Sequence, residues 1–381
     1  MVEMIQKYLK DEIELEYGKG LTRNQRKKGK IPVYGSNGII DYNDKACFQG
    51  PGIIIGRKGT VGSVKYEKND FWAIDTTYVV KLKNENEDSI FWYYFLQTLG
   101  LEKMNSHSAV PGLNRDRVYN IKINIPKKQE DRKKMSRILR NFDKKIESNN
   151  KMNNNLYEVS RTIFNELYKE SENWQNYKIQ DIGLYITDYV ANGSFKSLAD
   201  NVKIYDTKNY ALFVRNTDLK VNFTQERKYV DEHSYNFLSK SKLIGRELII
   251  SNVGDVGSIY LCPSYKTPMT LGNNVIMVNS KDLKVNYNYY LYYFFLSIEG
   301  QYLIDGITGG SAQPKFNKTD FRNSIIKIPS DDEIVEFNKK IIPLYDIIEK
   351  NIMENETLYK LRDTLLPKLM NGEIDLDNIE I

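Results

Sequence analysis

The stretch GRKGTVGSV, residues 56–64, combines three glycines with two cationic side chains, a composition typical of loops that bind phosphate. A nucleotide-binding loop needs a strand before it and a helix directly after it, so that backbone N–H groups converge on the anion. Aliphatic residues 53–55 predict the strand, but residues 63–66 alternate as a second strand does. We therefore predict a β-hairpin turn. A self-contained nucleotide-binding enzyme is the alternative, and it predicts saturable nucleotide binding by the isolated chain.

Side chains that bind metals or act as nucleophiles are scarce. The 381 residues include two cysteines, Cys47 and Cys262, and two histidines, His107 and His233. Zinc sites usually draw three or four ligands from these types at close spacing, and neither histidine lies in a catalytic motif. Both cysteines are expected to be small buried hydrophobic residues. Because motifs for triphosphate binding, zinc peptidases and amino-methyl transfer are also missing, we expect no catalytic residue, no metal site and no cofactor in this chain.

Cationic and amide side chains are the best candidates for binding. Residues 17–38 hold six cations and no acidic residue, and such basic stretches neutralise DNA phosphates, although a solvated lysine loop has the same composition. A turn is predicted at residues 34–38. Arginine reads guanine edges and asparagine reads adenine edges. The predicted DNA-binding residues are Lys19, Arg23, Arg26, Lys27, Lys28, Lys30, Ser36, Asn37, Arg57, Lys58, Asn114, Arg215, Asn216, Arg246, Asn252 and Asn317.

The overall composition predicts a cytoplasmic protein without a membrane partner. Hydrophobic residues make up 41% of the chain, the net charge is +5, and no apolar run approaches the ~20 residues of a membrane span. The first residues, MVEMIQKYLKDEIE, mix both charge signs too early for a secretory signal. The length allows two or three domains with substantial cores.

The chain contains an internal repeat. Residues 53–64 align with 248–259, and both copies keep aliphatic residues followed by Gly-x-Val-Gly-Ser, whereas the basic pair of the first copy is lost. The segment SAVPGLNRDRVYNIKINIP (108–126) aligns with SAQPKFNKTDFRNSIIKIP (311–329). Such a tandem pattern predicts two related globular units, each followed by its own helix.

Two kinds of helix are expected in each copy. The aromatic blocks predict buried core helices at about 88–105 and 286–304, and residues 128–170 and 331–370 carry apolar residues at steps of three and four. Asn149 is the kind of single polar residue that fixes coiled-coil register. The first long segment is net basic and the second net acidic, which favours mutual packing over two separate core helices. The predicted seam comprises Met135, Ile138, Phe142, Ile146, Asn149, Met152, Leu156, Val159, Ile163 and Leu167, then Phe337, Ile341, Tyr345, Ile348, Ile352, Asn355, Leu358, Leu365 and Leu369.

Four features of the sequence occur together in one known family. They are GKGLTRNQRKKGKIPVYGSNGIIDY (18–42), GPGIIIGRKGTVGSV (50–64), the tandem organisation, and the most specific stretch, LRDTLLPKLMNGEIDL (361–376). With them the whole chain resembles the specificity subunit of type I restriction-modification systems. The resemblance implies a mixed α/β fold with two β-rich target-recognition domains in tandem, separated by two long helices packed as an antiparallel coiled coil, with a pseudo-twofold repeat.

The resemblance also implies domain bounds and partners. Residues 1–126 and 171–329 would be the target-recognition domains, 127–170 the central helix, and 330–381 the C-terminal helix and tail. Each domain would read one half of a bipartite site in double-stranded DNA, while the helices set the spacer and dock two methyltransferase subunits, joined by motor-nuclease subunits. S-adenosylmethionine, ATP and Mg²⁺ are then expected in the partner subunits. A protein-interaction scaffold is a third hypothesis, and only DNA binding predicts affinity that falls steeply with salt.

One departure concerns the entry to each unit. The second unit begins with WQNYKIQDIG (174–183), which resembles the usual domain entry, whereas few residues precede Glu12 in the first. Either the N-terminus is shortened, or residues 1–9 take the same role with a different sequence.

Overall fold

The computed structural model divides the chain into two compact units. Unit 1 comprises Met1–Asn149 and Met353–Ile381, and unit 2 comprises Asn150–Ile352. Two long helices, α4 (Gln129–Glu170) and α11 (Asp331–Met370), each contribute residues to both units. Residues 108–111 and Ser311 of the repeated segments lie outside the described residues. The structure describes residues 2–104, 112–172, 174–223, 226–282, 284–310 and 312–376.

Each unit contains a four-stranded antiparallel sheet of the same strand order, which we call the frame sheet. The order is β2-β8-β5-β6 in unit 1 and β11-β19-β16-β17 in unit 2. These strands are β2 (Ile13–Tyr17), β5 (Gly52–Gly56), β6 (Val64–Glu67) and β8 (Thr77–Leu82), then β11 (Leu184–Asp188), β16 (Leu248–Ser251), β17 (Ile259–Leu261) and β19 (Val275–Ser280).

A second sheet in each unit differs between the units. Unit 1 has three strands in the order β4-β3-β7, and unit 2 has five in the order β12-β14-β13-β18-β15. The first set is β3 (Ile31–Gly35), β4 (Gly38–Asn43) and β7 (Trp72–Ala73). The other is β12 (Ile204–Tyr205), β13 (Ala211–Val214), β14 (Lys228–Val230), β15 (Lys242–Leu243) and β18 (Met269–Leu271), accompanied by α5 (Phe195–Asn201), α6 (Asn216–Lys220) and α7 (Glu232–Phe237).

Continuous aliphatic runs at the middle of each frame sheet are buried on both faces, because alternate side chains point to opposite sides of a strand. Ile53 and Ile55 pack with the aromatic helix α2 (Ser89–Gln97), whereas Ile54 packs with residues of the second sheet. Unit 2 repeats this layering, since Ile250 joins the core of α8 (Asn288–Leu296) and Ile249 joins the second sheet. The frame sheet is therefore the middle layer of each unit.

The aromatic blocks form buried helices, as predicted, but the bounds differ. In α2, Phe91 and Trp92 are fully buried. In unit 2 the predicted single helix is two, because Ser297 adopts an extended conformation and caps α9 (Ile298–Ile307) by accepting from the Gly300 N–H at 3.2 Å. A polar cap residue thus interrupts an otherwise continuous apolar pattern.

A short two-stranded ribbon opens and closes each globular part. In unit 1, β1 (Met4–Tyr8) pairs with β9 (Lys122–Pro126), and in unit 2, β10 (Gln175–Lys178) pairs with β20 (Ile325–Ile328). Residues 4–8 therefore take the place that the longer entry sequence takes in unit 2. The other α-helices in the described residues are α1 (Leu9–Glu12), α3 (Arg115–Tyr119) and α10 (Lys318–Asn323).

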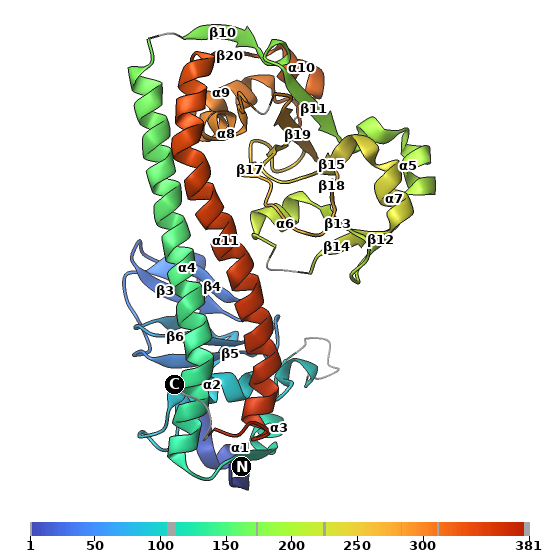
Figure 1. The fold of residues 1–381 in the computed structure, drawn as a ribbon. Coiled ribbons are helices and arrows are strands. Elements are labelled where there is room, and N and C mark those ends of the chain that lie inside the picture. The colour runs from blue at the N-terminus through green and yellow to red at the C-terminus, as the bar shows by residue number, and fades with distance from the viewer. Residues whose placement is uncertain are drawn as a thin grey trace. The chain divides into compact units, whose positions relative to one another are not determined.

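Within each unit, α4 and α11 lie side by side and run antiparallel (Figure 1). In unit 1, Asn149 Nδ2 donates to Asn355 Oδ1 at 2.9 Å. In unit 2, Asn351 Nδ2 donates to Asn153 Oδ1 at 2.8 Å, and the rings of Tyr157 and Tyr345 lie 6.0 Å apart.

Two predicted seam positions on α4 are wrong. Met152 and Val159 have exposed fractions of 46% and 48%, whereas the neighbouring Asn153 and Ser160 are buried. The hydrogen bond of Asn153 and the bond from Ser160 Oγ to the Leu156 carbonyl satisfy these buried polar groups. A pattern built on apolar residues alone misses such positions.

The C-terminal motif ends α11 and packs into unit 1. Leu369, Met370 and Leu376 are buried in the unit 1 core. Gly372 has a φ of +71°, and its N–H donates to the Leu369 carbonyl at 3.0 Å, as expected for a glycine that ends a helix. Among the described residues, no helix is both long and apolar enough to span a membrane.

Candidate nucleic-acid interface

The glycine-rich stretch is a turn between two strands, as predicted. It joins β5 to β6, and Gly59 and Gly62 have φ values of +79° and +77°. In unit 2 the equivalent Gly254 and Gly257 have φ values of +80° and +84°. Since β6 rather than a helix follows, the stretch lacks the geometry of a nucleotide-binding loop. The repeated glycines serve a backbone conformation that other residues rarely adopt.

Each glycine turn pairs with the other repeated segment of its own unit. In unit 1, Lys58 forms a β-bridge with Gly112, and the Leu113 N–H donates to the Arg57 carbonyl at 2.8 Å. In unit 2, Val253 bridges Lys315. There the Phe316 N–H also donates to the carbonyl of Asn252, at 3.1 Å. The two motifs that the repeat preserves are therefore contact partners.

The asparagines that follow these segments are helix caps. Asn114 Oδ1 accepts from the Arg117 N–H at 3.0 Å at the start of α3, and Asn317 Oδ1 accepts from the Asp320 N–H at 2.8 Å at the start of α10. Asn252 also has an internal partner, because its Nδ2 donates to the Phe316 carbonyl at 3.3 Å. Capping explains why asparagine occurs in both copies, and sequence alone does not separate this role from base reading.

The tip of the β3–β4 hairpin lies against the glycine turn of unit 1. Ser36 and Asn37 form the two-residue turn, since Gly35 pairs with Gly38. Ser63 Oγ donates to the Ser36 carbonyl, and a Cβ at Gly59 would lie 3.1 Å from Ser36 Oγ. The structure thus brings the predicted turn residues close to the turn that carries Arg57 and Lys58.

Contacts within unit 1 hold the guanidinium group of Arg57 in place. Its Nε and Nη2 donate to the Asp75 carbonyl at 3.1 and 2.6 Å, and its guanidinium carbon lies 5.3 Å from the centre of the Tyr17 ring. Arg115 approaches the same ring at 5.4 Å. Stacking on a tyrosine pre-orients the flat guanidinium group and leaves less side-chain freedom to lose on binding.

The basic stretch before the hairpin has anchored and exposed members. Arg26 Nη1 lies 3.0 Å from Asp41 Oδ2, and the Lys27 backbone N–H donates to Asn43 Oδ1 at 2.8 Å. The Tyr42 N–H and the Arg26 guanidinium lower the pKa of Asp41, which stays charged. The Lys19 carbonyl accepts from the Trp72 indole N–H at 2.8 Å. The exposed cationic side chains are those of Lys19, Arg23, Lys27, Lys28 and Lys30.

The candidates of unit 2 are mostly engaged within the unit. Arg215 forms a two-point ion pair with Asp218, at 2.9 and 2.6 Å, and Asp218 has an exposed fraction of only 2%. The neighbouring Asn216 has a buried amide oxygen without a hydrogen-bond partner in the described part of the chain. Three of them lie by the β16–β17 turn: Asn252 is part of it, Asn216 contacts its Asp255, and Asn317 follows Phe316, whose N–H donates to the Asn252 carbonyl.

Arg246 connects the frame sheet region of unit 2 to α11. Its φ is +68°, its Nε lies 3.0 Å from Glu349 Oε1, and its Nη2 lies 2.5 Å from Asp346 Oδ1. Ser264 Oγ donates to the same Glu349 oxygen at 3.0 Å, and the Arg246 carbonyl accepts from Asn288 Nδ2 at 2.9 Å. These contacts tie Arg246 to α11 and α8 within the unit.

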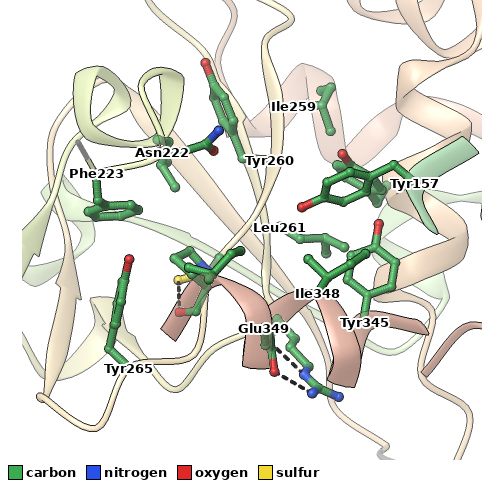
Figure 2. Close-up of a pocket in the computed structure, with 16 residues that line it drawn as sticks. Tyr157, Asn222, Phe223, Ile259, Tyr260, Leu261, Tyr265, Tyr345, Ile348 and Glu349 are labelled. Carbon is green, nitrogen blue, oxygen red and sulfur yellow. Dashed lines mark hydrogen bonds and ion pairs between the residues drawn. The ribbon is translucent and has the colours of Figure 1, made fainter. Parts of the chain in front are cut away.

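The ion pair of Arg246 and Glu349 borders a pocket of about 120 Å³ in unit 2 (Figure 2). Tyrosine rings and aliphatic side chains form most of its wall, and Cys262, which is buried as predicted, also lines it. Cys47 is only half-buried, and burial raises the pKa of both thiols. In the described parts of the chain, no three His, Cys, Asp or Glu side chains are grouped as a metal site would require.

Sequence reasoning missed the apolar surface of the hairpin. On β4, Ile39, Ile40 and Tyr42 are exposed to 48%, 46% and 51%. The signal was present in GIIDYN, where two adjacent aliphatic residues break the alternation that a half-buried strand requires.

The fold and the candidate site together define a class of protein. It is a tandem α/β chain whose two units have the same frame sheet and the same glycine turn, and both contain parts of two long helices. Two stretches, residues 1–158 and 171–360, match the family described as type I restriction modification DNA specificity domain. The chain therefore belongs to this family, as the sequence resemblance predicted. Specificity subunits of this family are not catalytic, in agreement with the expectation that this chain is not an enzyme.

Individual relatives agree with the family. The chain is 23% identical over 374 residues to the type I restriction enzyme MjaIX specificity subunit of Methanocaldococcus jannaschii, covering 91% of this chain and 84% of that protein. It is 25% identical over 211 residues to the HindI specificity subunit of Haemophilus influenzae, covering 53% of this chain and 42% of that protein. The crystal structure of an S subunit from M. genitalium matches with a TM-score of 0.60 at 14% identity, over 97% of this chain and 96% of that one.

Proposed function

We propose that this chain confers DNA sequence specificity on a type I restriction-modification complex, with each unit reading one half of a bipartite site. One observation carries the proposal: in unit 1, the exposed cations of residues 19–30 precede a hairpin whose tip lies on the glycine turn. Cations bind phosphates and fix the position of the protein, while amide and guanidinium groups at the tip read base edges. Asn37 and Arg57 are the proposed base-reading residues of unit 1.

We assign the recognition domains to residues 1–126 and 171–329, with the central helix at 127–170 and the C-terminal helix and tail at 330–381. For unit 2, we propose that the predicted DNA-binding residues mainly support the recognition surface. Arg215 and Arg246 would support the surface through their ion pairs, and Asn216 keeps a buried amide oxygen without a hydrogen-bond partner in the described residues.

We further propose that α4 and α11 form an antiparallel coiled coil with pseudo-twofold symmetry. Asn149 and Asn351 hold the same place in their helices, twenty residues after the first residue of each. Asn153 and Asn355 hold the place four residues later. The hydrogen bond of Asn149 with Asn355 thus has its counterpart in that of Asn351 with Asn153, the reciprocal pairing that a twofold axis produces.

The helices would then set the spacer between the two half-sites. At ~1.5 Å per residue, helices of 42 and 40 residues are about 60 Å long, which exceeds the ~34 Å of one turn of duplex DNA. We also assign to them the docking of two methyltransferase subunits, with motor-nuclease subunits joining that core in the cytoplasm. Base flipping, S-adenosylmethionine, ATP and Mg²⁺ belong to those partners in this scheme.

The test is to co-express the chain with its methyltransferase subunit and map N6-methyladenine across the host genome. We expect methylation at one bipartite motif, with two short specified parts separated by a fixed number of unspecified base pairs. A variant lacking residues 171–329 should lose that motif. Methylation that is unchanged when this chain is absent would refute the proposed function.

A further inference from the structure

The exposed apolar side chains of β4 need an explanation, because this strand lies at a sheet edge. In the described residues β4 pairs with β3 alone, and Ile39, Ile40 and Tyr42 are each about half exposed. Exposed apolar edge strands favour aggregation, so proteins usually cover or charge them. An uncovered one indicates a surface that another molecule occupies.

A β-bulge turns adjacent side chains of β4 outward. Val33 pairs with Asp41, but the next residue, Tyr34, pairs with Ile39, so Ile40 has no partner on β3. Without the bulge, Ile39 and Ile40 would point to opposite faces of the strand. A bulge re-aims side chains in this way and is common beside functional sites. Here it leaves two β-branched aliphatic side chains exposed to similar extents, 48% and 46%.

Cations flank these isoleucines at both ends of the strand. At the start of β4, Lys65 Cε lies 3.9 Å from where a Cβ of Gly38 would be. Near its end, the exposed Lys27 is held by its backbone N–H to the Asn43 side chain, while Arg26 is paired with Asp41. An apolar strip between cations fits a polyanion that presents apolar groups, and duplex DNA is such a molecule because each thymine exposes a methyl group in the major groove.

We propose that Ile39 and Ile40 contact thymine C5-methyl groups in the half-site that unit 1 reads. A two-stranded β-ribbon fits the major groove, where the thymine methyl is the apolar feature that distinguishes one base pair from another. Asn37, at the hairpin tip, carries the side chain type that pairs with adenine, so the hairpin is suited to A·T pairs. This inference rests on the proposed function and specifies the chemistry of one half-site.

Uracil substitution tests this contact directly, since uracil differs from thymine only by the missing methyl group. The full chain in complex with its methyltransferase subunit is titrated with duplexes carrying the mapped motif, in which each thymine of both half-sites is replaced in turn. We expect the replacement of at least one thymine in one half-site to lower the affinity of the complex for the duplex about fourfold, which is the effect of withdrawing one buried methyl group. Fluorescence anisotropy at fixed salt measures each dissociation constant.

The variant Ile39→Ala/Ile40→Ala assigns the methyl contact to the hairpin. We expect the variant to bind thymine and uracil duplexes equally, whereas the matched control Ile204→Ala, which changes a half-exposed isoleucine of unit 2, should keep the fourfold difference. Uracil replacement requires no protein variant, so a folding defect does not obscure the first result.

Each outcome separates the inference from the proposed function. Specific binding in which no thymine methyl matters would overturn the inference and leave the proposed function intact. A methyl effect that persists in the double variant would also overturn it, because another side chain would then make the contact. If the wild-type complex binds the motif no better than unrelated duplex DNA, both the proposed function and the inference fail.

Discussion

Individual side chains of unit 1 fall into two groups, those that build the surface and those that face solvent. Arg26 and Asn114 build it through an ion pair and a helix cap, whereas Lys27 and Lys28 expose their ammonium groups. Exposed ammonium groups bind phosphates as point charges, with little dependence on base sequence. Under the proposed function, the two groups are therefore expected to contribute differently to DNA binding.

Replacing Lys27 and Lys28 with alanine should weaken DNA binding uniformly across sequences. Each lost phosphate contact reduces the slope of log K against log salt by about 1, so the double variant should lose about 2. The matched control is Lys350→Ala, an exposed lysine on α11. An unchanged slope in the double variant would remove these lysines from the interface.

Glu247 predicts a pH dependence of stability. Its side chain is 1% exposed, and burial raises the pKa of its carboxyl above the ordinary 4.5, although the N–H groups of Ile244 and Gly245 oppose this shift. Because the folded protein holds this proton more tightly than the unfolded chain, protonated Glu247 adds its full contribution to stability below pH 4.5. That contribution is lost as pH rises through the folded-state pKa. Relative to Glu247→Gln, wild-type stability should therefore fall over this range. Urea denaturation from pH 4 to 8 measures it, and parallel curves would contradict the expectation.

At the scale of elements, the sequence predicted the hairpin turn, the buried aromatic helices and the two long helices. These have strong local signals: glycines at fixed spacing, continuous aromatic runs and steps of three and four. The split at Ser297 and the inward positions of Asn153 and Ser160 were missed, because a cap or a buried polar pair depends on partners distant in sequence. The DNA-binding residues stay a prediction, and their contacts within the fold could not be predicted for the same reason, since only the structure shows that Asn114 caps a helix and Arg246 binds Glu349.

The buried asparagine pairs are expected to make a measurable contribution to the free energy of unfolding. Asn149→Ala removes a buried hydrogen-bond partner of Asn355 and should lower the free energy of unfolding by about 1–3 kcal/mol. Replacing both residues with leucine should cost less, because no buried polar group then loses its partner. Thermal denaturation of Asn149→Leu, Asn355→Leu and the double leucine variant tests the interaction as a mutant cycle. Additive effects would show that the two side chains do not interact.

Arg246 was predicted to bind DNA, whereas its ion pairs with α11 favour a role in stabilising unit 2. Arg246→Lys keeps the charge but loses the two-point geometry toward Glu349, so it should lower the stability of the chain by about 1–3 kcal/mol. The salt slope of DNA binding should stay unchanged. A reduced slope with wild-type stability would restore the original assignment.

For the whole molecule, the coiled-coil proposal predicts how the recognised motif responds to a weakened seam. Leu358 is partly buried on α11, while Leu361 on the same helix is 47% exposed. Leu358→Lys should leave both half-sites unchanged but allow more than one spacer length, because each unit keeps its own core. Genome-wide methylation mapping measures this, with Leu361→Lys as the control. A single unchanged spacer in the Leu358 variant would argue against the helices as the ruler.

The division of each unit into a common frame sheet and a different second sheet bears on how such a protein evolves. The glycine turns bridge the second repeated segment at Lys58 and Val253, and the capping asparagines of α3 and α10 lie in that segment in both units. These contacts occur in both units, whereas the second sheet has three strands in one unit and five in the other, so one type of frame sheet carries two different additions. Under the proposed function, recombination that exchanges the second sheet alone is therefore expected to change the half-site read by one unit and to leave its frame sheet intact.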